Sequence, residues 1–198
     1  MVLAPTRVGF IFAGVWSEIG PDGSARGLQM GSFCIRLYFM RPTIYLDATV
    51  PSYWLEQGPD PIVHGRHLIT RKWWSDDLPR FEVYVSQAVL DELAGGDPDR
   101  AAKRLHLVRN FPLLDIDDEV RQAARFYIQH LAMPSGNPND AIHLALASVH
   151  AIEYLVTWNY AHLANASKRT HIEVLNRRLH LASPVICSPE ELMLEPMA

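Results

Sequence analysis

Cysteine is scarce in this chain, and basic residues do not outnumber acidic ones. The two cysteines, Cys34 and Cys187, form neither a C-x-x-C pair nor a zinc-ligand spacing. They therefore exclude a disulfide framework and fit free thiols in a reducing cytosol. The formal net charge of −4 excludes a global attraction to nucleic acid. Any phosphate-binding surface must be a local patch or use metal ions.

Long apolar runs are also missing. No stretch approaches the roughly 18–20 apolar residues that span a bilayer, so we expect a cytoplasmic protein with no membrane contact. Nine histidines show neither H-x-x-x-H nor H-E-x-x-H spacing, which argues against a zinc hydrolase. The length of 198 residues and the 48% hydrophobic content suit one globular domain with a single core.

The first forty residues differ from the rest. They are rich in glycine and contain one apolar run, 8–16, without clear helical or strand periodicity. A secretory signal fits poorly, because Arg7 is the only basic residue ahead of the run and 17–21 is a poor cleavage site. We expect 1–40 to be a poorly ordered N-terminal extension without catalytic residues, and 41–198 to form a single domain.

From residue 41 onward, strand and helix patterns alternate. Runs rich in β-formers predict strands over 44–47, 81–85, 111–115, 152–157 and 185–186. Helical patterns occupy the intervals between them, with predicted caps at Ser86, Asp117 and Asn137. Ser188-Pro-Glu-Glu191 predicts a capping box that opens a terminal helix. Strands alternating with helices predict an α/β fold with a mostly parallel central sheet, covered on both faces.

Four polar residues follow strands or begin helices. Asp47 ends the first predicted strand, and Asn159 follows the fourth. Glu92 lies on the helix after the second strand, and Asp140 lies in the first turn of its own helix. Because the carboxyl ends of parallel strands meet at one edge of a sheet, we expect these side chains to converge.

Clustered carboxylates without a basic partner repel one another. A hard cation such as Mg²⁺ or Mn²⁺ relieves that repulsion, since such ions prefer oxygen ligands. The pattern therefore predicts a divalent-metal site that acts on a phosphodiester through a metal-activated water.

Several motifs match a known family. They are Asp47-Ala-Thr49, Ser86-x-x-Val89-Leu90-x-Glu92-Leu93, Asn139-Asp140-Ala-Ile-His-Leu-Ala-Leu-Ala and Tyr154-Leu-Val-Thr157-Trp-Asn159. Together, over about 43–186, they resemble the PIN-domain nucleases, which include the VapC-like toxins of bacterial toxin–antitoxin pairs. The resemblance implies a three-layer α/β/α fold in which Asp47, Glu92 and Asp140 bind Mg²⁺ or Mn²⁺ and cleave RNA. It also implies a cognate antitoxin as partner.

The sequence departs from the family pattern at Asn159, where an acid usually follows the Thr-x pair. An amide oxygen can ligate a hard metal but adds no negative charge, so affinity for a second ion should fall. The Thr49 and Thr157 hydroxyls are expected to orient a carboxylate or contact a phosphate. Lys168 and Arg169, close to Asn159 in sequence, are the first candidates for RNA contact.

Blander interpretations exist for each acid. Asp47 could cap a helix, and Asp140 could simply favour the positive end of the helix dipole. Asp91 competes with Glu92 but points about 100° away around the helix. His143, one turn after Asp140, could be a ligand or a general base. We interpret it instead as a hydrogen-bonded structural residue, since imidazole suits softer metals than Mg²⁺.

Roles for His162 and Asn165 are left open. Trp54, Trp73, Trp74 and Trp158 are interpreted as core or partner-interface residues and not as base-stacking platforms. The early tryptophan-rich helices resemble the region where such toxins form homodimers or receive an antitoxin segment.

The sequence thus predicts a metal-dependent endoribonuclease that acts as the toxin of a toxin–antitoxin pair. The alternative is a catalytically impaired PIN-like module that binds RNA or protein, with Asn159 marking the loss of catalysis. A phosphotransferase with Asp47 as nucleophile would need a second aspartate two residues later, where Thr49 stands.

Overall fold

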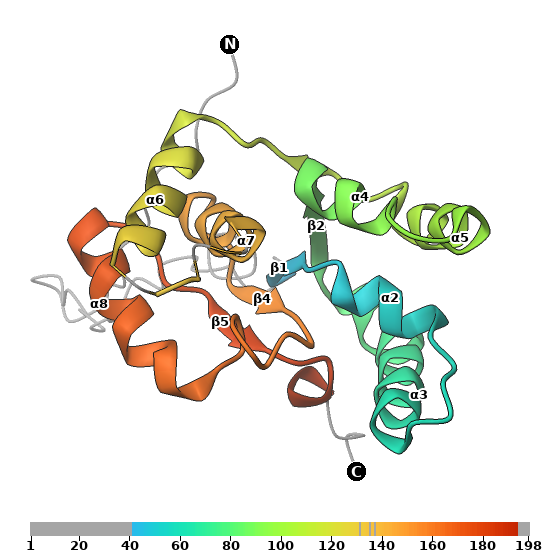
Figure 1. Ribbon diagram of the computed structural model, residues 1–198. Helices are drawn as coiled ribbons and strands as arrows, with labels where there is room; N and C mark the ends of the chain where they lie inside the picture. The colour runs from blue at the N-terminus through green and yellow to red at the C-terminus, as the bar shows by residue number, and fades with distance from the viewer. Residues whose placement is uncertain (1–40, 131, 135, 137, 194–198) are drawn as a thin grey trace, which may run out of the picture. The chain divides into compact units, whose positions relative to one another are not determined.

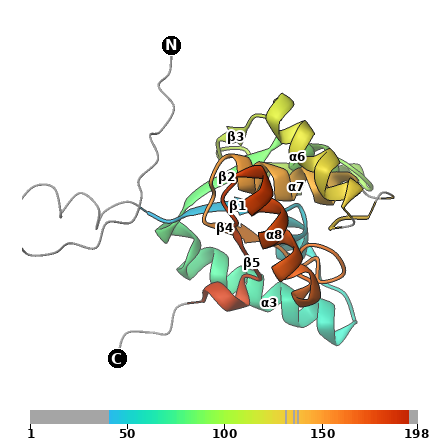
Figure 2. The same cartoon turned by 90° about the vertical axis from the view of Figure 1, so that its left-hand side faces the viewer.

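Parallel strands organise the computed structural model of this chain, which describes residues 41–130, 132–134, 136 and 138–193. The five-stranded sheet has the order β3-β2-β1-β4-β5, and every neighbouring pair is parallel (Figures 1 and 2). The strands are β1 (Thr43–Leu46), β2 (Glu82–Ser86), β3 (Leu113–Leu114), β4 (Tyr154–Val156) and β5 (Val185–Cys187).

Helices cover both faces of this sheet. The helices α2, α3, α4 and α5 lie on one face and α6, α7 and α8 on the other (Figure 1), as right-handed crossovers require. Their bounds are α2 (Thr49–Leu55), α3 (Pro61–Asp76), α4 (Gln87–Leu93), α5 (Pro98–Val108), α6 (Asp118–Gln129), α7 (Pro138–Val149) and α8 (Arg169–Leu179). The predicted three-layer α/β/α fold is therefore confirmed.

Residues of β1 and α7 are among the most deeply buried of the core. Ile44, Tyr45 and Leu46 are fully buried, as expected for a strand with a neighbour on each side and helices on each face. Leu144 and Leu146 of α7 are also fully buried. An α-helix that buries nearly its whole circumference cannot present a polar stripe, which explains the unbroken apolar run after His143.

Side-chain caps fix several helix starts. Ser86 Oγ accepts from Val89 N, and Asp117 Oδ1 accepts from Val120 N, as predicted. Ser188 and Glu191 also form a capping box, in which Ser188 N donates to Glu191 Oε2.

The segment after the capping box differs from the prediction, because the predicted terminal helix is a single 3₁₀ turn over Glu190–Leu192. Met193 takes extended dihedral angles, which end the turn. The predictions for 1–40 and for Asn137 as a cap lie outside the described residues.

The topology changes direction at β1. From β1 the chain moves through β2 to β3 on one side, and it then returns to β4 and β5 on the other. The carboxyl ends of β1 and β4 therefore flank a topological switch point, where open α/β sheets bind their ligands. Among the described helices, none combines the length and apolar character needed to cross a bilayer.

Candidate active site

Asp47 lies at this switch point, directly after β1, and is 3% exposed. Its Oδ2 accepts hydrogen bonds from Thr49 Oγ1 at 2.5 Å and from Thr157 Oγ1 at 2.6 Å. Each hydroxyl in turn accepts a backbone N–H, Thr49 from Trp158 and Thr157 from Asn159, both at 2.9 Å. The two threonines thus hold the carboxylate by one oxygen and tie it to the segment after β4.

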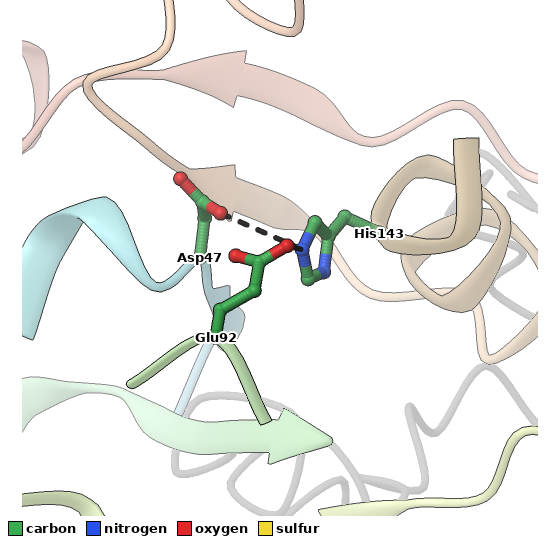
Figure 3. Close-up of side chains that lie close together, drawn as sticks. All are labelled: Asp47, Glu92 and His143. Carbon is green, nitrogen blue, oxygen red and sulfur yellow. Dashed lines mark hydrogen bonds and ion pairs between the residues drawn. The ribbon is translucent and has the colours of Figure 1, made fainter. Parts of the chain in front are cut away.

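The other oxygen of Asp47 faces a histidine and a second acid (Figure 3). Asp47 Oδ1 lies 3.7 Å from His143 Nε2, and Glu92 Oε1 lies 3.3 Å from the same nitrogen. Potential ligand atoms of these three residues all lie within 4.8 Å of one another. Glu92 comes from α4, and its side chain retains 31% of its exposure, so the cluster is open to solvent on this side.

The His143 ring is oriented from behind by Tyr45. The Tyr45 hydroxyl lies 2.7 Å from His143 Nδ1 and 2.7 Å from Ser86 Oγ, so it can donate to one and accept from the other. Both Tyr45 and His143 are almost completely buried. The hydrogen-bonded role expected for His143 is present, but its Nε2 also points between two carboxylates, which the sequence did not predict.

Asp140, in the first turn of α7, is 4% exposed and hydrogen-bonded to Asn159. The amide Nδ2 of Asn159 donates to Asp140 Oδ1 at 2.9 Å, while its Oδ1 accepts from His162 N at 3.1 Å. In this arrangement the amide presents its nitrogen to the acid. Asn159 lies beside the acids as expected, with its oxygen turned to the backbone.

Charge interactions join the acids into one group. Burial raises the pKa of Asp140, and the charges of Asp47 and Glu92 raise it further, against the lowering effect of His162 and His143. Burial also acts to raise the pKa of Glu92, but the hydrogen bonds from His143 and Asn139 outweigh it and leave that pKa lowered.

At His143 the neighbouring carboxylates also outweigh burial, and here the net result is a raised pKa. Burial lowers its pKa, yet the bond to Glu92 and the charges of Asp47, Glu92 and Asp140 overcome that effect and raise it. In the described part of the chain, His143 is the basic side chain that lies between Asp47 and Glu92, against three acids. The site therefore has excess negative charge.

This donor set fits a divalent cation. Carboxylate oxygens are the ligands preferred by Mg²⁺ and Mn²⁺, and three carboxylates with one imidazole carry more negative charge than the protein neutralises. Asp47 Oδ1 and Glu92 Oε1 both face His143 Nε2, and these three residues form the group that could hold an ion.

The competing residues face elsewhere. Asp91 accepts a hydrogen bond from Gln87 on the exposed side of α4, so Glu92 is the acid of that pair that faces the cluster. The contact of the Asp47 carboxylate with the backbone of α2 is the long one, 3.4 Å to the Thr49 N–H. The cap position of α2 is Ala48. Helix capping therefore does not account for Asp47.

The candidate RNA contacts lie at the start of α8. Lys168 ends a 3₁₀ turn, Ala166–Lys168, which precedes that helix. Arg169 is exposed and forms an ion pair with Glu191 at 3.7 Å, and its guanidinium also donates to the Ile186 carbonyl. Asn165, left open from sequence, accepts from Ser167 N and so caps the 3₁₀ turn.

Fold and site together define an α/β domain with a cluster of acidic side chains at the switch point of a parallel sheet. A family model described as PIN domain matches residues 44–168, more than half of the chain, and the chain belongs to the PIN-domain family. Divalent-metal-dependent nuclease activity is a general property of that family.

No curated protein compared with the chain matches it. Among solved structures the chain is similar to VapBC2 from Rickettsia felis, crystallised bound to a DNA fragment from their promoter. The identity is 15% and the TM-score 0.42, over 74% of this chain and 98% of that chain. At that TM-score the likeness supports no inference about this protein.

Proposed function

We propose that this protein is a divalent-metal-dependent endoribonuclease whose acidic site is formed by Asp47, Glu92 and Asp140. One observation carries the proposal: Asp47, directly after β1, and Glu92, on α4, have potential ligand atoms within 4.8 Å of each other. Asp140, on α7, is linked to Asp47 through Asn159 and Thr157. Membership of the PIN family supports the same reaction class.

These three acids would hold Mg²⁺ or Mn²⁺. When bound, such an ion supplies charge neutralisation, orientation of phosphate oxygens and a lower pKa for water. Thr49 and Thr157 keep Asp47 in one orientation through their paired hydroxyls. Tyr45 orients the His143 ring, whose Nε2 holds Glu92 toward Asp47.

Asn159 takes a positioning part in this proposal. Its Nδ2 donates to Asp140 and its backbone N–H donates to Thr157. Because Thr157 bonds Asp47, Asn159 connects Asp140 to Asp47 through one threonine. Ligation through its oxygen requires the amide to turn away from His162 N. Lys168 and Arg169 remain proposed phosphate contacts, and Arg169 lies against the edge strand β5. To contact a phosphate, Arg169 must leave its ion pair with Glu191.

We further propose that the nuclease is a cytoplasmic toxin, neutralised by a cognate antitoxin and able to form a homodimer. The motifs that resemble VapC-like toxins support this role. Expression in bacterial cells tests it: the parent chain should arrest growth and the Asp47→Asn variant should not. Normal growth with confirmed expression of an RNA-cleaving parent would refute the toxin assignment.

Cleavage of a labelled single-stranded RNA tests the nuclease. We expect cleavage with Mg²⁺ or Mn²⁺, none with EDTA, and none for Asp47→Asn or Asp140→Asn, each with the far-UV circular dichroism of the parent. Asp91→Asn is the matched control, because it removes an acid next to Glu92 that bonds Gln87 instead, and it should cleave normally. Undiminished cleavage by Asp47→Asn would remove the proposed site.

A second candidate, a binding module without catalysis, is favoured by the amide nitrogen that Asn159 presents to Asp140. Metal binding separates the two. A ligand at 100 times its dissociation constant adds about 2.7 kcal/mol to stability, or about 5–10 °C for a chain of this size. No shift in melting temperature at 10 mM Mn²⁺ would favour the binding module.

A further inference from the structure

Next in the chain to Asn159 is an aromatic cluster with one arginine. The cluster is formed by Tyr53, Arg66, Trp158 and Tyr160. The Arg66 guanidinium carbon lies 5.3 Å, 5.5 Å and 5.2 Å from the ring centres of Tyr53, Trp158 and Tyr160 respectively. Arg66 also donates to the Tyr53 hydroxyl at 2.9 Å. Trp158 packs edge-on against both tyrosines, at 6.1 Å in each case.

The backbone connects this cluster directly to the candidate active site. Trp158 and Tyr160 flank Asn159, which bonds Asp140, and the Trp158 N–H donates to the Thr49 hydroxyl that holds Asp47. Neighbouring Cα atoms are only 3.8 Å apart. The aromatic cluster is therefore joined to the acidic residues by one short segment, 158–160.

Burial within the cluster is uneven. Trp158 is 4% exposed and its indole N–H donates to Thr70, so it is part of the core, as the sequence predicted. Tyr160 is 41% exposed. The cluster thus consists of a fixed indole beneath a phenol ring that has an open surface for a ligand.

Arg66 differs from Arg169 in its partners. Across the residues that the structure describes, the Arg66 guanidinium forms no ion pair with a carboxylate, whereas Arg169 is paired with Glu191. Three aromatic rings attract the Arg66 guanidinium by cation–π interaction. A planar cation held in this way can stack on a nucleobase or bond a phosphate without first breaking a salt bridge.

We propose that Tyr160 and Arg66 form a stacking site for an unpaired RNA base next to the scissile phosphate. The inference rests on the proposed nuclease function and adds the residues that would hold the base beside the cleaved bond. Without a bound metal the acidic cluster repels phosphates, so an adjoining surface that contacts the base adds substrate affinity. Stacking on an aromatic ring and an arginine provides it without sequence preference. A base within a duplex has both faces covered and cannot use such a site.

Binding of a fluorescent RNA tests the site independently of cleavage. The probe is a ten-nucleotide oligouridine with one central 2-aminopurine, added to the Asp140→Asn chain so that no cleavage occurs. Stacking on Tyr160 should quench the 2-aminopurine fluorescence. Tyr160→Ala and Arg66→Ala, in the same background, should each weaken binding about tenfold, the loss expected for one stacked base, and Tyr160→Ala should abolish the quenching.

Conservative and matched variants provide the controls. Tyr160→Phe should retain affinity and quenching, because it keeps the ring. Arg66→Lys should lose affinity, because lysine keeps the charge without the planar group. Arg71→Ala should bind like the parent, since Arg71 lies on the same helix but stacks on Trp54 instead. The same probe annealed to its complement should bind at least tenfold more weakly.

Two results would overturn the proposal. In one, Tyr160→Ala binds the probe with the affinity and quenching of the parent. In the other, it leaves RNA binding unchanged but alters the elution volume in size-exclusion chromatography, which would make the cluster a protein interface. Failure of the nuclease proposal is a different outcome, seen as no cleavage by the unmutated chain while binding still depends on Tyr160.

Discussion

Replacing Thr157 by valine should separate the orientation of Asp47 from its charge. Thr157 is fully buried, and valine has nearly its shape but no hydroxyl. The substitution removes the 2.6 Å hydrogen bond to Asp47 Oδ2 and the acceptor for the Asn159 N–H. Asp47 keeps its charge, and Thr49 Oγ1 remains as the second donor to the same oxygen.

The size of the effect can be worked out from these two contacts. A hydrogen bond to a charged group contributes about 1.5–3 kcal/mol, and an unsatisfied buried N–H costs about 1–3 kcal/mol. Because Thr49 still bonds Asp47 and the Asn159 N–H is only part-buried, we expect a loss near the lower end, about 2–4 kcal/mol. For a chain of this size that lowers the melting temperature by roughly 5–15 °C. Residues that orient metal ligands typically contribute about 10–100-fold in metal affinity or activity, and we expect a loss of that size.

Thermal melts without metal and a Mn²⁺ titration of stability measure both effects. Thr157→Ser is the control, since it keeps the hydroxyl and should retain metal affinity within about twofold, well inside the loss expected for valine. If Thr157→Val melts with the parent and shows the same Mn²⁺ midpoint, the hydroxyl does not orient the carboxylate and the reasoning fails.

Three further predictions concern residues around this network. Asn159→Asp should tighten Mn²⁺ binding and lower metal-free stability, because a carboxylate replaces the donor to Asp140; thermal melts with and without Mn²⁺ check both. Burial raises the pKa of Cys187 to about 12, so the folded thiol keeps its proton after the unfolded one has lost it. Stability should therefore fall as pH rises above about 8.5, and alkylation of Cys187 at pH 8, followed by peptide mass mapping, should require unfolding. Tyr127→Phe should cost about 1–2 kcal/mol in a denaturant melt, since the Tyr127 hydroxyl donates to buried Asn176.

Local chemistry made much of the fold predictable. The strand predicted over 44–47 is short and apolar, begins with the β-branched Ile44 and ends in the carboxylate of Asp47, before a turn. In the structure it is the central strand. The caps at Ser86 and Asp117 depend on bonds within three residues. Such contacts require no knowledge of the rest of the chain.

The terminal helix shows where local chemistry fails. Its capping box forms as expected, but a box satisfies only the first turn. Beyond that turn a helix in a protein depends mostly on packing of an apolar face. The chain turns to extended geometry at Met193, so the start signal is present without the helix.

The spacing of His143 from Asp140 indicates a place near the acids, but an imidazole is not a preferred ligand of Mg²⁺. His143 lies three residues after Asp140, and residues with that spacing share a face of a helix. Its orientation, however, depends on Tyr45, which is 98 positions away in the chain. Spacing could place the imidazole near the acids, but only the packing of β1 against α7 turns Nε2 toward Asp47 and Glu92.

Asn159 presents the same difficulty at a smaller scale. Its position beside Asp140 follows from the topology, because it comes just after β4 at the edge of the sheet where Asp47 lies. Which end of the amide faces the acid depends on the His162 N–H, which takes the oxygen. A sequence can predict the neighbourhood of a side chain far better than the direction of a polar group with two different ends.

The two oxygens of Asp47 have different tasks in this arrangement. Oδ2 is occupied by two threonine hydroxyls, and Oδ1 faces His143 and Glu92. Removing a hydroxyl therefore alters the direction of Oδ1 without changing the charge, while Asp47→Asn alters the charge without removing either threonine. If the proposed metal depends on both, Thr157→Val should weaken metal binding in part and Asp47→Asn should abolish it. Unchanged metal binding by Thr157→Val, with lower stability, would mean that the threonines act only on stability.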